Sequence, residues 1–163
     1  GLMWTDIDWK RGTITIQRQR TTVGNETVTK DAPKGDKDGS KIRTVPVYPD
    51  ILELLRQHKV DQMKRQLADL DWMESGLVFV GEHGTPPAAN RVNKRLAKLV
   101  ARVGNLPKGL RPHDLRHTAL FLLEQAGVAP SIRMALGGHS TASMALHYID
   151  HASVEDVRRA IGG

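Results

Sequence analysis

The sequence predicts an α+β fold in which a small N-terminal antiparallel sheet precedes a mostly helical body. Residues 13–16 alternate threonine with isoleucine, the period of two that is typical of a half-buried strand. From residue 50 onward, apolar residues recur instead at helical spacing. A chain of 163 residues suffices for one well-cored domain and is short for two, so we expect residues 1–163 to form one domain.

Turn and strand signals divide the first third of the chain. Residues 33–40 are rich in glycine, aspartate and lysine and have no apolar residue beyond Pro33, which indicates an exposed, mobile hairpin tip. Pro46 lacks a backbone N–H, so a strand that contains it is expected at a sheet edge. The expected order is strand 13–16, turn 23–26, strand 27–29, hairpin tip 33–40 and returning strand 43–47.

Two helices are expected in the middle of the chain, separated by a short buried strand or extended segment at residues 76–80. Asp50 is a plausible N-cap of the first helix. Its expected apolar face consists of Ile51, Leu54, Leu55, His58, Met63 and Leu67. The second, residues 90–103, is a basic amphipathic helix whose expected apolar side consists of Val92, Leu96, Leu99 and Val103.

The last third is predicted to be a series of helices. Pro112 suits a first helical turn, and Gly127 is expected to end that helix. Two short helices follow at residues 131–136 and 141–148, with a glycine pair between them, and a terminal helix begins near Ser153.

Composition narrows the classes of partner and chemistry. The net charge of +6 and the pI of about 9.8 favour a polyanionic partner such as nucleic acid or an acidic membrane surface. The sequence has no apolar run long enough to predict a transmembrane helix and no secretory signal. The absence of cysteine excludes disulfides, cysteine-based zinc sites and a thiol nucleophile, which fits a cytoplasmic location.

Four residues of the last third are of the types that phosphoryl transfer requires. His113 and Arg116 are three apart near the start of a predicted helix, where free N–H groups and the helix dipole favour a phosphate. His139 and Tyr148 follow further along. Arginine can clamp a phosphate, histidine can move protons, and a tyrosine hydroxyl can attack phosphorus.

These residues lie in motifs that resemble a known family. The sequence PHDLRHT at residues 112–118, then Gly-His-Ser at 138–140 and Tyr148, is similar to the C-terminal signature of tyrosine recombinases, the phage integrase family. Upstream, residues 2–8 (LMWTDID) resemble the strand entry of that family, and residues 33–47 resemble its lysine-bearing β-hairpin. The resemblance covers nearly the whole chain and implies the family's fold for DNA breaking and rejoining.

The resemblance also implies roles for individual residues. Tyr148 would attack the scissile phosphate of double-stranded DNA, forming a 3′-phosphotyrosyl link and leaving a free 5′-hydroxyl. Arg116 would stabilise charge on the non-bridging oxygens. His113 and His139 would hydrogen-bond the phosphate and manage protons, with His113 as the favoured general base.

A hairpin lysine would protonate the 5′-oxygen. Lys34 is favoured because it stands between Pro33 and Gly35 as in the family, and Lys37 is the alternative because the tip is longer than usual. The resemblance implies neither a metal ion nor ATP, and it implies a homo-oligomer, a tetramer on DNA.

One element of the family pattern lies outside this sequence. The family's first catalytic arginine precedes the tryptophan that matches Trp4 by more than the three residues present here, and the DNA-clamping N-terminal domain has no counterpart. The chain also opens on Gly1 without an initiator methionine. We therefore expect a fragment that does not cleave DNA by itself, whereas a version extended upstream does.

Other residues of the motif region have plainer interpretations as well. His117 is expected to orient Tyr148 or the helix, and Arg116 alone is compatible with an ion pair to Asp114 or Glu124. Two histidine pairs, 113 with 117 and 147 with 151, have zinc-compatible spacing, yet no HExxH motif is present and we expect no metal. On the basic helix, contacts to the DNA backbone are expected from Arg91, Lys94, Arg95 and Lys98.

Two further functions stay open beside recombination. Type-IB topoisomerases share similar chemistry, and a non-catalytic prophage remnant that only binds DNA is the other alternative. Residues 149–161 are apolar on one side, which fits docking on a neighbouring protomer or on the chain's own core.

Overall fold

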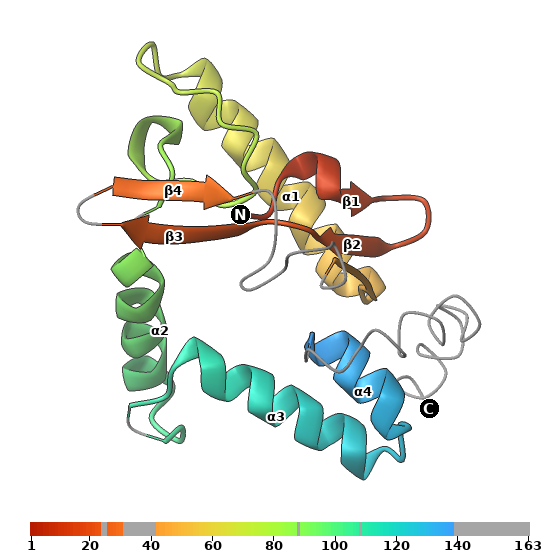
Figure 1. The fold of residues 1–163 in the computed structure, drawn as a ribbon. Helices are drawn as coiled ribbons and strands as arrows, with labels where there is room; N and C mark the ends of the chain where they lie inside the picture. Colours follow the sequence, from red (N-terminus) through yellow and green to blue (C-terminus); the bar gives the residue numbers. More distant parts are fainter. Residues whose placement is uncertain (24–25, 31–41, 88, 108, 139–163) are drawn as a thin grey trace. The chain divides into compact units, whose positions relative to one another are not determined.

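The computed structural model describes residues 1–23, 26–30, 42–87, 89–107 and 109–138, and it divides the chain into two compact units, residues 1–87 and 88–163 (Figure 1). The structure is mixed α and β, as predicted. Unit 1 contains η1 (Trp4–Asp6), β1 (Ile7–Asp8), β2 (Thr13–Ile16), β3 (Gln19–Val23), β4 (Glu26–Lys30), β5 (Arg43–Pro46), α1 (Pro49–Leu67) and η2 (Glu82–Gly84). Unit 2 contains α2 (Ala89–Val103), α3 (Pro112–Gln125) and α4 (Pro130–Gly137).

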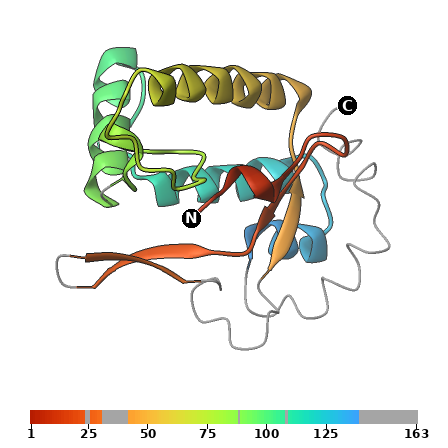
Figure 2. The same ribbon diagram turned by 90° about the horizontal axis from the view of Figure 1, so that it is seen from above.

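The strands of unit 1 form two antiparallel sheets. The larger has the order β1-β2-β5, so β5 with Pro46 lies at an edge, as its missing N–H predicts. The smaller is the ribbon β3–β4, which Figure 2 shows extending away from the three-stranded sheet. Strand β2 ends at Ile16. Gln17 and Arg18 connect it to β3, so the polar residues that follow Ile16 do not extend β2.

Helix α1 packs on the three-stranded sheet through a face that matches the predicted one only in part: Leu55 is buried as predicted, and His58 is half-buried. Leu52 and Leu55 are buried with Ile7, Val47 and Val78, and such burial contributes roughly 1.5–3 kcal/mol for each large apolar side chain. Of the residues expected on the apolar face, four are exposed: Ile51, Leu54, Met63 and Leu67. The spacing of apolar residues alone did not identify which stripe meets the sheet.

The predicted N-cap of α1 is also wrong. Tyr48 is the N-cap and Pro49 is the first helical residue, which places Asp50 inside the first turn. Proline has the helical φ already fixed and no N–H to leave unsatisfied, so the helix begins at Pro49. Asp50 still interacts favourably with the helix dipole at this end.

Residues 76–80 form an extended segment, one of the two forms expected. Its backbone connects to the N-terminal residues through the bridge Met3–Leu77 and through Val78 N–H, which donates to the Leu2 carbonyl at 3.0 Å. Val78 has no exposed surface, whereas Phe79 is largely exposed. This segment therefore closes the core of unit 1.

The helices of unit 2 begin and end close to where the sequence predicts. Pro112 is the first residue of α3, and Gly127 follows its C-cap with a positive φ of 73°. Gly138 adopts the left-handed conformation as the C-cap of α4. The expected apolar side of α2 is wrong in part, because Val92, Leu99 and Val103 are more than half exposed, while Val100 is buried.

Several predictions fall outside the described residues. These are the turn residues 24–25, the hairpin tip 33–40, the helix 141–148 and the helix expected from Ser153. Among the residues that are described, none belongs to a helix long and apolar enough to cross a membrane.

Candidate functional site

The start of α3 holds the described part of the predicted site. Arg111 is the N-cap, and its backbone N–H donates to the Asp114 carboxylate at 2.8 Å, while its guanidinium lies 3.4 Å from the same carboxylate. The backbone hydrogen bond from Arg111, and then the bonds from its side chain, lower the pKa of Asp114. Asp114 therefore fixes the beginning of the helix and stays ionised.

His113 and His117 form a pair one turn apart on α3. Their Nε2 atoms are 3.0 Å apart, and their rings meet edge to face with centroids 4.5 Å apart. One Nε2 must donate and the other must accept, so at least one ring is neutral and carries its hydrogen on Nδ1. Both side chains are exposed, so the pair is accessible to a substrate. The sequence predicted an orienting role for His117 but not this contact.

Arg116 lies on the same side of α3 as His113 and is half-buried. The carboxylates considered as its ion-pair partners have other arginines beside them. Asp114 pairs with Arg111, and Glu124 pairs with Arg133 at 3.1 Å.

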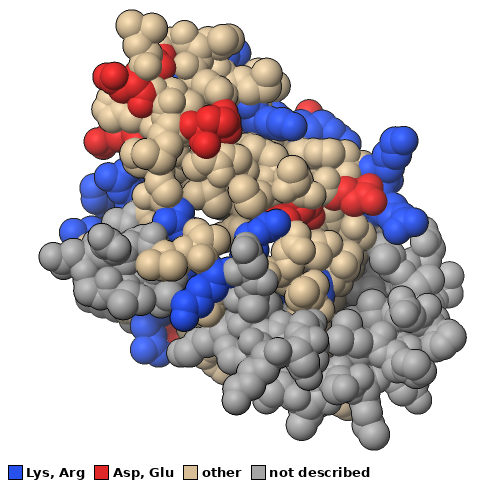
Figure 3. Space-filling model, turned by 45° about the horizontal axis from the view of Figure 1, so that its top comes forward, with Lys and Arg blue, Asp and Glu red and all other residues tan. Residues whose placement is uncertain are grey.

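Helix α2 carries the four basic residues predicted to contact DNA. Lys94, Arg95 and Lys98 are exposed, and Arg91 is half-buried. On the face shown in Figure 3, basic and acidic side chains of the described residues are interspersed.

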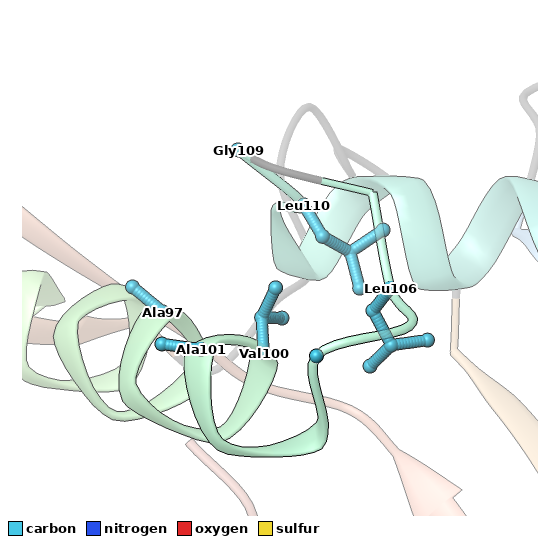
Figure 4. Close-up of a pocket in the computed structure, with 7 residues that line it drawn as sticks. Ala97, Val100, Ala101, Leu106, Gly109 and Leu110 are labelled. Carbon is cyan, nitrogen blue, oxygen red and sulfur yellow. The ribbon is translucent and has the colours of Figure 1, made fainter.

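Unit 2 also contains an apolar hollow of about 520 Å³ between the end of α2 and the segment that leads to α3 (Figure 4). It is lined by Ala97, Val100, Ala101, Gly104, Leu106, Gly109 and Leu110. None of these side chains is titratable, so the hollow offers nothing for proton or phosphoryl transfer. It is a packing feature near the start of α3.

Four of the predicted site residues lie outside the described residues: Lys34, its alternative Lys37, His139 and Tyr148. Their roles stay predictions. Within the described part of the chain, no group of three histidine, aspartate or glutamate residues could hold a metal ion.

Unit 1 contains a charged cluster for which the sequence predicted no role. Asp6 has a carboxylate that is 2% exposed, and Arg18 donates to both of its oxygens at 2.6 and 2.7 Å. Burial alone would raise the pKa of Asp6, but hydrogen bonds from the Met3 backbone N–H, Arg18 and Gln17 outweigh it and lower the pKa. An acid among apolar residues, LMWTDIDW, is the signal that could have indicated a buried, paired carboxylate.

Comparisons with known proteins identify the family of this chain. Residues 1–155 match the model of the phage integrase family. A XerC-like tyrosine recombinase of Caldanaerobacter subterraneus subsp. tengcongensis is 29% identical over 99% of this chain and 43% of its own length. The integrase of Staphylococcus phage L54a is 27% identical over 91% of this chain and 41% of its own length.

A solved structure shares the fold. The integrase of transposon Tn1549, in complex with a circular intermediate DNA, superposes with a TM-score of 0.68 at 24% sequence identity. The match covers 99% of this chain and 52% of that one. The chain spans less than half the length of the two curated relatives above. On the family-model match over nearly its whole length, the chain belongs to the phage integrase family.

Proposed function

We propose that this chain carries the catalytic chemistry of a tyrosine recombinase, which breaks and rejoins strands of double-stranded DNA through a phosphotyrosine at Tyr148. The observation that carries the proposal is the start of α3. There a hydrogen-bonded histidine pair and Arg116 share the positive end of a helix, in a chain of the phage integrase family. The two units would act together as one catalytic domain.

The proposed reaction is a phosphoryl transfer without metal or ATP. The Tyr148 hydroxyl attacks phosphorus and gives up its proton to His113. The new bond joins phosphorus to the tyrosine oxygen, and the bond to the 5′-oxygen breaks. Arg116 and His139 donate hydrogen bonds to the non-bridging oxygens, where negative charge grows in the transition state. Lys34, or alternatively Lys37, protonates the leaving 5′-oxygen.

Rejoining runs through the same steps in reverse. A 5′-hydroxyl attacks the phosphotyrosine, and the tyrosine leaves. The phosphotyrosyl link is itself a phosphodiester and replaces the DNA phosphodiester that is broken, so no outside source of energy is required. Both relatives are named as recombinase or integrase, and the solved relative is in complex with DNA. We further propose a homo-oligomer, a tetramer on DNA, acting in the cytoplasm.

The test is a trapping assay with the product of the complete reading frame, run beside the 163-residue chain. The substrate is a pool of duplexes with randomised centres, each nicked so that the short 5′-hydroxyl product diffuses away. We expect a covalent protein–DNA adduct that resists detergent, with the DNA on Tyr148 by mass spectrometry. Sequencing the trapped DNA then identifies the target.

The chain provides a matched control. It has two tyrosines, and Tyr48, the N-cap of α1, is half exposed. Tyr148→Phe should abolish the adduct and Tyr48→Phe should keep it. Adducts without sequence preference, together with relaxation of supercoiled DNA, indicate a topoisomerase instead. Binding without any adduct indicates a non-catalytic DNA-binding protein.

A further inference from the structure

The Asp6 carboxylate is held by a dense set of hydrogen bonds in unit 1. It accepts from the Met3 backbone N–H at 2.8 Å and from Gln17 Nε2 at 2.7 Å. Nη1 of Arg18 adds contacts of 2.6 and 2.7 Å to the two oxygens. With the carboxylate almost wholly buried, these bonds hold the N-terminal residues and the residues after β2 in one arrangement.

The residues that Asp6 holds lie at a structural junction. Gln17 and Arg18 are the two residues between β2 of the three-stranded sheet and β3 of the ribbon. In the sheet, Ile16 is opposite Arg43, the first residue of β5. In the ribbon, Gln19 is opposite Lys30, the last residue of β4.

The segment that connects β4 to β5 contains both candidate lysines, Lys34 and Lys37. The residues that flank this segment are Lys30 and Arg43. Their partners in the two sheets, Gln19 and Ile16, are the residues on either side of Gln17 and Arg18. A shift in the junction would therefore move both ends of the lysine-bearing segment. The Asp6 carboxylate is at the base of that segment without belonging to it.

We propose that Asp6 is a positioning residue for the lysine that protonates the 5′-oxygen, an inference that rests on the proposed function. Misplacing a reacting group by about 1 Å can cost about 100-fold in rate. Asp6→Asn keeps the size of the side chain but removes the charge that Arg18 pairs with. The segment that carries the lysine then loses its fixed anchor in unit 1. Tyr148 and Arg116 belong to unit 2, so we expect this change to affect the lysine first.

The chemistry of the leaving group isolates this effect. When the phosphorus–oxygen bond breaks, the 5′-oxygen takes a proton from the lysine ammonium and leaves as a hydroxyl. When that bridging atom is replaced by sulfur, the leaving group is a thiolate, whose conjugate acid has a pKa of about 8.5 and which needs no proton to leave. A defect in protonation is therefore rescued by the sulfur substrate, and a general loss of fold is not.

The experiment measures single-turnover cleavage of matched oxygen and sulfur substrates by the product of the complete reading frame. We expect Asp6→Asn to lower the rate about 100-fold with oxygen and to leave the sulfur rate within about 3-fold of wild type. Asp8→Asn is the matched control, because Asp8 belongs to the same motif and its carboxylate contacts the exposed turn at Lys10 and Arg11. Its rates should match wild type on both substrates.

Two further variants complete the test. Lys34→Ala, or Lys37→Ala if Lys37 is the acid, should show the same sulfur rescue, and combining it with Asp6→Asn should add little. Arg18→Gln keeps a hydrogen-bond donor but removes the charge that pairs with Asp6, so we expect an oxygen-specific loss of about 10-fold if Asp6→Asn does not fold.

The outcomes separate the two proposals. Equal losses with oxygen and sulfur in both the Asp6 and Arg18 variants overturn the positioning role, as does an Asp6→Asn enzyme with full activity on oxygen. A wild-type protein that forms no adduct from either substrate overturns the proposed function itself.

Discussion

The two charged clusters of this chain, around Asp6 in unit 1 and at the start of α3 in unit 2, are built in opposite ways. The Asp6 carboxylate is buried and accepts hydrogen bonds from three residues, so it has nothing left to offer a ligand. His113 and His117 are exposed and share one hydrogen bond. Burying a charge is costly unless it is fully paired, whereas exposed groups stay solvated until a substrate arrives. The first cluster therefore serves structure and the second is suited to chemistry.

The largest expected effect tests the chemical side of this comparison. Arg116→Ala should lower the rate of DNA cleavage by about 100- to 1,000-fold, because it removes the charged donor that we propose for the transition-state oxygens. Circular dichroism should show an unchanged helix content. Arg111→Ala is the control, because Arg111 is on the same helix start but is engaged by Asp114. Equal losses in both variants would show that general positive charge, not the position of Arg116, matters.

For the Asp6 cluster, the comparison predicts a loss of folding stability in addition to any loss of cleavage rate. Asp6→Ala removes the buried carboxylate that pairs with Arg18, whose side chain is 19% exposed. Removing one member of a buried ion pair costs about 3–5 kcal/mol in the free energy of unfolding. Urea denaturation followed by tryptophan fluorescence measures it, because Trp4, Trp9 and Trp72 all lie in unit 1. Asp8→Ala should change the free energy by less than about 1 kcal/mol; similar losses would contradict the comparison.

The pH dependence of stability sharpens the same point. The folded-state pKa of Asp6 is below its ordinary value of 3.8, since the hydrogen bonds outweigh burial. The unfolded chain therefore takes up the proton first, so the stabilisation is complete above about pH 5 and is lost as the pH falls through the folded-state pKa. The difference in stability between wild type and Asp6→Asn should shrink over that range. A difference that stays constant down to about pH 2 would show that the ionised carboxylate is not the stabilising group.

The same contrast explains what the sequence predicted and what it did not. Helix α3, with His113 and Arg116 near its start, was predictable because Pro112 and Gly127 are local signals along one stretch. The Asp6 cluster was not, because its partner Arg18 is distant in sequence and the pairing depends on how β2 leaves the sheet. For the same reason, the sequence predicted α1 as a helix and Leu55 on its apolar face, but not Leu52, which is buried through its contact with the core of unit 1.

A smaller effect is expected on the basic face of α2. Lys94→Gln with Lys98→Gln should weaken DNA binding at every sequence and reduce the slope of log affinity against log salt by about 0.9 for each phosphate that the two lysines neutralise. Filter binding over a range of salt concentrations measures it. Lys64→Gln is the control, because Lys64 is on α1 and lies 3.7 Å from Asp61. An unchanged slope in the double variant would remove α2 from the DNA interface.

The smallest effect concerns the partner of the proposed general base. His117→Ala removes one hydrogen bond to His113 and leaves His113 itself exposed on α3. Such a bond contributes about 0.5–1.5 kcal/mol, so cleavage should slow by about 2- to 10-fold. His113→Ala should lower the cleavage rate about 100-fold or more, because it removes the proposed general base. The cleavage rates of His117→Ala and His113→Ala, measured on one trapping substrate, assign the roles. Equal losses would mean that His117 acts on the substrate directly and that the pair, not His113 alone, carries the proton.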